Sequence, residues 1–200
     1  MTTLPYPMLY PNIEVITMPI SAIITRIDEL KPNAYTATTK LGWINHVDGA
    51  VWNEIYKYTG FSDVMRQTGI AAHALPVGVD FSLVTNVYVD GEEIFPITFK
   101  DFETTGYYRG TDGKLNIYPV PTANDVTAGL RIVYRLPFVP HVAATEEAYM
   151  PVPFDKAYDD YTAAMVDKYD QQPESYTNNV NYYNNGMKEY AAWYADHKEE

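Results

Sequence analysis

Cysteine is absent from this chain of 200 residues, and basic side chains are few. Without thiols the chain cannot form disulfides, a cysteine nucleophile or a thiolate metal site. Fourteen Lys and Arg against 26 Asp and Glu give a net charge of −12, which disfavours general binding to nucleic acid or to anionic membranes. The chain also lacks a run of about 18–20 apolar residues and a basic leader, so we expect no membrane span and no targeting segment.

Tyrosine is the abundant residue, with 19 copies, whereas the rest of the composition is typical of a globular protein. Tyrosine combines apolar area with a polar tip, and protein interfaces are enriched in it. The composition therefore favours a folded protein that works through contacts with other molecules.

Four segments follow from the patterning. Residues 1–16 carry three prolines and predict an extended N-terminal arm. Helical spacing dominates residues 17–72 and 138–200, and residues 73–137 change to a period of two. We predict an α+β fold: a four-helix body, with two N-terminal and two C-terminal helices, that carries a small antiparallel β-unit as an insertion.

Capping and turn-forming residues support the predicted ends of these elements. Thr17 suits the N-cap of the first helix, Gly60 suits the end of the second, and Pro173 suits the first position of the last. In the β-unit, Asp90-Gly91 and Asp112-Gly113 separate runs rich in β-branched and aromatic residues, which is a strong signal for hairpins. A last strand is predicted over residues 130–135.

Catalytic and cofactor motifs are missing from the chain. It has no phosphate-binding loop, dinucleotide fingerprint, nucleophile elbow or HExxH zinc motif. His46 lies near Asp48 but lacks further ligands of metal-site spacing, and we interpret Asp155 and Asp159 as residues of a helix N-terminus rather than as a cation site. We predict a non-enzymatic protein without a metal or cofactor.

Aromatic residues outside the expected helical seam are the candidate contact residues. The seam of the last helix is Tyr176, Val180, Tyr183, Met187 and Tyr190. Tyr182 and Trp193 lie off it, and together with Tyr194 they predict an interface with another subunit or a partner protein. Tyr6, Tyr10 and Ile13 of the arm are expected to dock into a neighbouring molecule.

Both helical ends resemble a known group of proteins. The segments IITRIDELKPNAY over 23–35 and KLGWINHVDGAVW over 40–52 are similar to the opening of head–tail connector (adaptor) proteins of tailed bacteriophages and prophages. The segments ESYTNN over 174–179 and EYAAWY over 189–194 look like the terminal helix of that group. The β-region and the arm carry no diagnostic motif.

The resemblance implies a structural role in the virion, at the head–tail junction, after assembly in the host cytoplasm. Such adaptors form a homo-oligomeric ring, usually a dodecamer, that binds the portal protein, extends the DNA channel and receives a stopper or tail-completion protein. DNA passes through without specific binding. Acidic side chains suit such a channel, and Asp159, Asp160 and Asp167 are the candidates to line it.

Two alternatives stay open. The chain is also compatible with a tail-completion or minor tail protein of the virion. A carbohydrate-binding module is an alternative of a different class, with Tyr88, Phe95 and Tyr108 of the β-unit as the binding aromatics.

Overall fold

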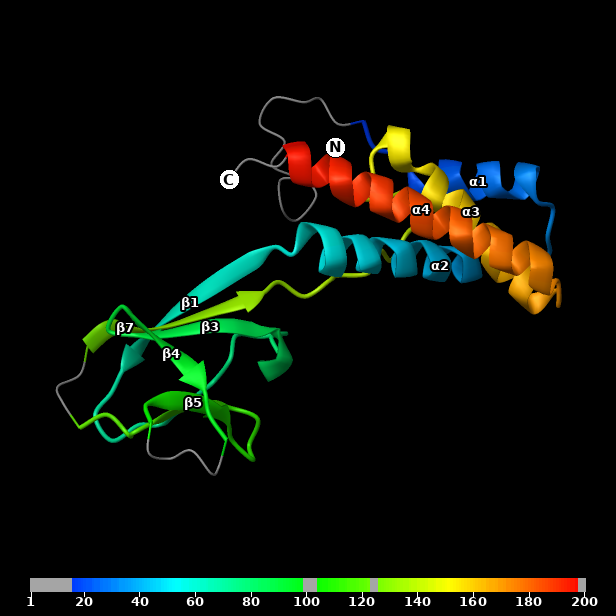
Figure 1. Cartoon of the computed structure of the whole chain (residues 1–200). Helices are drawn as coiled ribbons and strands as arrows, with labels where there is room; N and C mark the ends of the chain where they lie inside the picture. The colour runs from blue at the N-terminus through cyan, green and yellow to red at the C-terminus, as the bar shows by residue number, and fades with distance from the viewer. Residues whose placement is uncertain (1–15, 99–103, 123–125, 198–200) are drawn as a thin grey trace. The chain divides into compact units, whose positions relative to one another are not determined.

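A computed structural model describes residues 16–98, 104–122 and 126–197. The chain divides into two compact units: residues 57–137 form one, and the residues before and after them form the other. We call these the sheet unit and the helical unit (Figure 1).

The helical unit holds α1 (Ile20–Leu30), α2 (Ala37–Ala50), α3 (Lys156–Tyr169) and α4 (Pro173–His197) among its described residues. A π-helical turn (Val51–Tyr56) continues α2, and a short 3₁₀ turn (Val152–Phe154) precedes α3. α3 and α4 lie side by side (Figure 1). The prediction that Pro173 begins the last helix is confirmed.

The first helix forms as an amphipathic segment, but its start differs from the prediction. Ile20, Ile23, Ile24 and Ile27 recur at helical spacing and are all buried. The N-cap is Pro19, not Thr17, and it provides no side-chain hydrogen bond. Instead, the loop before α3 accepts bonds from the first turn of the helix, since the Ile20 N–H donates to the Glu146 carbonyl over 2.9 Å.

The sheet unit contains seven strands in its described residues: β1 (Thr59–Arg66), β2 (Ala72–His73), β3 (Val84–Val89), β4 (Glu92–Pro96), β5 (Gly106–Arg109), β6 (Leu115–Tyr118) and β7 (Val126–Arg135). Their order in the sheet is β1-β7-β3-β4-β5-β6-β2. All pairs are antiparallel except β4 with β5, which is parallel. A 3₁₀ turn (Phe81–Leu83) leads into β3.

The hairpin predicted at Asp90-Gly91 is confirmed. β3 pairs with β4 from Val89↔Glu92 onward, so these two residues are the whole loop. Asp90 and Gly91 both have positive φ, of 51° and 88°. A two-residue loop with this backbone matches the right-handed twist of the strands that it joins.

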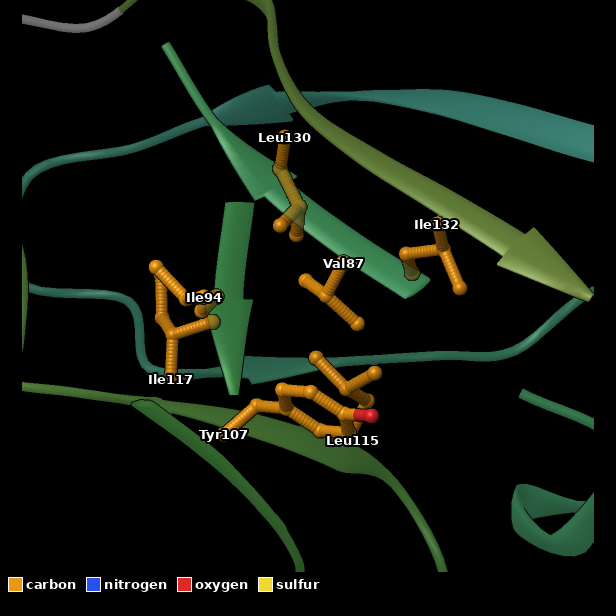
Figure 2. Close-up of a cluster of buried hydrophobic side chains, with 7 residues drawn as sticks. All are labelled: Val87, Ile94, Tyr107, Leu115, Ile117, Leu130 and Ile132. Atoms are coloured by element: carbon orange, nitrogen blue, oxygen red, sulfur yellow. The ribbon is translucent and has the colours of Figure 1, made fainter. Parts of the chain in front are cut away.

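One face of the sheet unit carries its hydrophobic core (Figure 2). The buried members come from five strands: Val87, Ile94, Tyr107, Leu115, Ile117, Leu130 and Ile132. Figure 2 shows these side chains converging on a common interior.

The chain is α+β, but the prediction of a four-helix body with a small antiparallel insertion is wrong. The sheet is seven-stranded and mixed, and it begins at Thr59, inside residues predicted as helical body. Gly60, predicted as a helix stop, lies within β1. The helices also do not form their core alone, because Ala148 and Met150 of a non-helical segment are completely buried in the helical unit.

The physical reason for this error is the character of β1. This strand has one neighbour, β7, among the described residues, and its burial alternates between exposed and half-buried positions. A half-exposed edge strand shows little hydrophobic contrast in the sequence. The parallel β4–β5 pair depends on a contact across residues 97–105, and no local turn signal announces it.

Gly106 provides a test of that parallel pair. A Cβ atom at Gly106 would lie 2.5 Å from the Phe95 carbonyl oxygen and 2.4 Å from Ile97 Cγ2. We expect Gly106→Ala to lower the free energy of unfolding by about 1–3 kcal/mol, because backbone must move to make room. Gly42→Ala is the matched control: α2 leaves its Cβ position open, and we expect a gain of up to about 1 kcal/mol. Urea denaturation measures both, and equal effects would contradict the packing argument.

Candidate functional site

The exposed face of α4 carries one of the residues predicted at an interface. α4 is 25 residues long, which corresponds to about 37 Å, yet Tyr190 is its one fully buried residue. Tyr182 is 57% exposed, and its ring lies 5.7 Å from the Lys156 ammonium of α3. The side of α4 that holds Tyr182 therefore remains accessible.

Trp193 and Tyr194, the other two predicted residues on α4, have partners inside the chain. The Trp193 ring lies 5.3 Å from Phe154 and stacks on His197 at 4.7 Å. The Tyr194 ring lies 5.0 Å from Tyr56. Both side chains are half-buried, so part of their surface packs within the helical unit. The predicted arm residues Tyr6, Tyr10 and Ile13 lie outside the described residues.

The three acidic residues predicted to line a channel all have basic partners within the helical unit. Asp159 shares Arg26 with Asp155, at 3.0 Å and 2.7 Å. Asp160 pairs with Lys156, one turn earlier on α3. Asp167 is completely buried and accepts bonds from Lys31 and from the Asn179 side chain. Asp167 therefore holds α1, α3 and α4 together rather than facing solvent in this chain.

Burial shapes the titration of Asp159. Loss of water around its carboxyl raises the pKa to about 6, although Arg26 favours the charged form. The neighbouring charges of Asp155 and Asp160 raise the pKa further. With a pKa of about 6, the Asp159 carboxyl gains a proton in mildly acidic solution.

A polar cluster, formed by the buried residues Asp48, His141 and Tyr158 and the half-buried Glu146, lies in the helical unit. The His141 ring bridges two carboxylates: its Nε2 lies 2.9 Å from Asp48 Oδ2 and its Nδ1 lies 3.2 Å from Glu146 Oε2. Asp48 Oδ1 accepts from the Tyr158 hydroxyl and from the Tyr149 N–H. Asp48, His141 and Tyr158 are at most 5% exposed.

The cluster retains its proton more strongly than the separate groups would in water. Burial opposes the imidazolium, but the hydrogen bonds and charges of Asp48 and Glu146 outweigh it and raise the pKa of His141. Burial also raises the pKa of the Asp48 carboxyl, against the bonds from His141 and Tyr158. Both shifts act in the same direction, so the Asp48–His141 pair releases its proton at a higher pH.

This geometry fits a structural role. Both ring nitrogens of His141 are engaged, and a buried imidazole offers no position to a substrate. The Asn45 side chain clamps the backbone of the same residue, donating to its carbonyl over 3.0 Å and accepting from its N–H over 2.7 Å. The cluster therefore fixes the segment before α3 onto α2.

Sequence reasoning missed this cluster. It placed His46 beside Asp48, but the structure stacks His46 on Tyr161 with ring centroids 4.9 Å apart. The true partner, His141, lies 93 positions further along the chain. The available signal was that Asp48, a polar residue, falls at helical spacing on the same face of α2 as the buried Trp43, Ile44 and Val47.

The aromatics of the carbohydrate alternative share one face of the sheet unit. Tyr88, Phe95 and Tyr108 each follow a buried residue of their own strand, so alternation directs them away from the core. Phe95 is 65% exposed, and the other two are half-buried. Tyr88 also lines a hollow of about 430 Å³ with Gly91, Ala128, Gly129 and Arg131.

Within the described residues, no group of three or more His, Asp or Glu side chains is placed to hold a metal ion. The helices of the same residues include none with the length and apolar character for a bilayer crossing. Asp155 and Asp159, considered above as a cation pair, instead converge on Arg26.

No family model and no curated protein matches this chain. The connector hypothesis therefore depends on the quoted sequence segments and on the physical character of the surfaces described above.

Proposed function

We propose that this chain is a non-enzymatic structural subunit of a tailed-phage virion, a head–tail connector that forms a ring below the portal. It joins the capsid to the tail through contacts with copies of itself, with the portal and with a stopper or tail-completion protein. The ring extends the channel through which DNA passes without specific binding.

The observation that carries the proposal is the exposure of α4. A helix that serves only its own domain normally buries a stripe of about a third of its residues. α4 has such a stripe, half-buried along Tyr176, Val180, Tyr183 and Met187 and fully buried at Tyr190. Its opposite side is accessible and presents Tyr182 together with Asn178, Asn181 and Asn185. Tyrosine and asparagine suit protein contacts that combine apolar area with hydrogen bonds.

The charge of the chain supports the same role. A net charge of −12 repels DNA phosphates, which suits a conduit that must release DNA rapidly. Because Asp167 is buried, we assign the repulsion to the net charge rather than to that residue.

Electron microscopy of a lysate from the parent phage with this gene deleted tests the proposal. We expect DNA-containing or leaking heads beside separate, complete tails, because a missing connector prevents their joining. A plasmid copy of the gene is expected to restore joined particles, whereas Tyr182→Ala restores fewer of them despite an unchanged melting temperature. Intact virions that fail only to infect would refute the connector role.

The same micrographs separate the related alternative. A tail-completion or minor tail protein would leave filled, closed heads and incomplete tails. The location of the defect within the particle therefore distinguishes the two virion roles.

One observation favours a second candidate of a different class. Tyr88, Phe95 and Tyr108 point to the same solvent-facing side of the sheet unit, as aromatics of a carbohydrate-binding surface would. A saturable change of tyrosine fluorescence on addition of cell-wall glycans, lost in Phe95→Ala, would support that candidate. No change with any glycan would exclude it.

A further inference from the structure

The sheet unit ends at one side in an open edge of substantial length. β1 spans eight residues and pairs with β7 alone among the described strands, whereas the opposite edge strand, β2, has two residues. Just before β1, the Tyr58 carbonyl accepts the N–H of Leu136 over 2.8 Å. Since backbone groups alternate in direction along a strand, the N–H and C=O of Thr59, Phe61 and Asp63 face the open edge.

The first half of this edge lacks the devices that normally protect such strands, whereas Asp63, Arg66 and a bulge between Val64 and Arg66 lie further along β1. Phe61 and Met65 are 61% and 43% exposed, and β1 contains no proline or lysine. The same odd-numbered residues that offer backbone groups to the edge also present their side chains on the solvent face. An exposed edge with apolar side chains is a template for another extended chain.

The N-terminal segment MTTLPYPMLYPN has a matching chemical pattern. Its prolines occupy positions 5, 7 and 11, all of them odd. In an extended strand, odd and even residues direct their backbone groups to opposite sides, and proline has no N–H to donate. Every donor on the even side is therefore intact: those of Leu4, Tyr6, Met8, Tyr10 and Asn12.

We propose that residues 4–12 of a second copy of this chain add to the open edge of β1 as an antiparallel strand. Nine extended residues span about 30 Å, which matches the length of β1. Antiparallel pairing places residues that bond to each other on the same face, so Tyr6 and Tyr10 lie beside Phe61. The prolines then face outward and prevent addition of a further strand.

The geometry of the exchange is head-to-tail. The donor segment and the acceptor edge are different parts of one chain, so each copy can give to one neighbour and receive from the other. Such a contact closes into a ring when the rotation allows it. The choice of a second copy as the donor rests on the proposed connector ring. The open edge of β1 and the positions of the prolines are independent of that proposal.

Two proline substitutions in the 200-residue chain test whether the even-numbered N–H groups of the donor segment face β1. We expect Met8→Pro to weaken self-association about tenfold, because it removes a donor that faces β1. Leu9→Pro is the matched control and is expected to change the association constant less than twofold, since its N–H faces away. Sedimentation velocity over a concentration series measures both, and circular dichroism checks the fold. A chain that stays monomeric throughout, or equal effects of the two prolines, would overturn the proposal.

Cross-linking identifies the donor. The natural chain has no cysteine, so a mixture of Thr59→Cys with Tyr6→Cys or Tyr10→Cys molecules forms a mixed disulfide only between copies. We expect dimers from one of these mixtures and at least tenfold fewer with Leu9→Cys. A disulfide that forms within one chain of a double variant, and not between copies, would reject the second copy as donor. Cross-linked dimers of the purified chain beside a phage deletion that leaves heads and tails joined would refute the connector role but not the strand exchange.

Discussion

Asp48→Ala is expected to lower the free energy of unfolding of the helical unit by about 3–5 kcal/mol. The substitution removes the acceptor of three buried donors: the His141 ring, the Tyr158 hydroxyl and the Tyr149 N–H. It also leaves the charge on His141 with Glu146 as its remaining partner. An unsatisfied group in a dry interior costs more than a lost surface contact, because water cannot replace the missing partner.

Urea denaturation followed by tryptophan fluorescence measures this effect in the correct unit. All three tryptophans of the chain, Trp43, Trp52 and Trp193, belong to the helical unit. Asp170→Ala is the control, because it removes the acceptor of the exposed Tyr35 hydroxyl, a bond of 3.0 Å. We expect that control to cost less than about 1 kcal/mol. Similar losses in the two variants would contradict a special role for the buried cluster.

The same cluster predicts a pH dependence with a definite sign. The pKa of His141 is raised above its ordinary 6.5, so its contribution to stability is complete below pH 6.5 and is lost as pH rises through the folded value. For Glu146, burial opposes the charge, but the N–H groups of Ala143 and Val142 outweigh it and lower the pKa below 4.5. Its contribution is complete above pH 4.5 and is lost as pH falls through the folded value. The stability difference between the natural chain and His141→Gln should therefore be largest between pH 4.5 and 6.5; an increase of this difference towards pH 9 would contradict the assignment.

Ile132→Ala is expected to destabilise the sheet unit by about 2–5 kcal/mol. Ile132 is completely buried on β7, the central partner of β1 and β3, and Figure 2 shows it facing Val87 and Leu115. Truncation of the isoleucine side chain to a methyl group leaves a cavity that the strands around it cannot fill by a small movement.

Hydrogen exchange of the backbone amides in β3 and β7 measures this loss directly. Val133→Ala is the matched control on the next position, where the half-buried side chain lies on the opposite face, and we expect a loss below about 1 kcal/mol. Equal acceleration of exchange in both variants would contradict the location of the core. The tryptophan signal, recorded in parallel, reports whether the helical unit unfolds in the same step.

Local patterns predicted the elements whose information is contained within a few residues. The isoleucines of α1 have a strict helical spacing, and all four of them are buried. Asp90-Gly91 encodes its turn through two positive φ angles, and Pro173 suits the first helical position, where the N–H has no partner within the helix. These features depend on backbone sterics and short-range hydrogen bonds, which are set by residues that are neighbours in the sequence.

The spacing along α4 predicted the exposure of one candidate contact residue but not of another. Tyr182 lies off the helical seam and is exposed. Trp193 also lies off the seam, but Phe154 and His197 cover part of it. Helical spacing indicates which face a residue occupies, yet it contains nothing about which other segment packs there.

Local patterns are thus sufficient to predict the α+β character, the long C-terminal helix and the hairpin at Asp90-Gly91. They do not predict that β1 joins the sheet at its edge, that β4 and β5 pair in parallel, or that His141 rather than His46 is the partner of Asp48. Each of these depends on contacts between residues far apart in the chain, where loop closure and the competition for buried partners select the arrangement. Local periodicity is unchanged whichever distant partner is chosen, and for that reason it could not predict them.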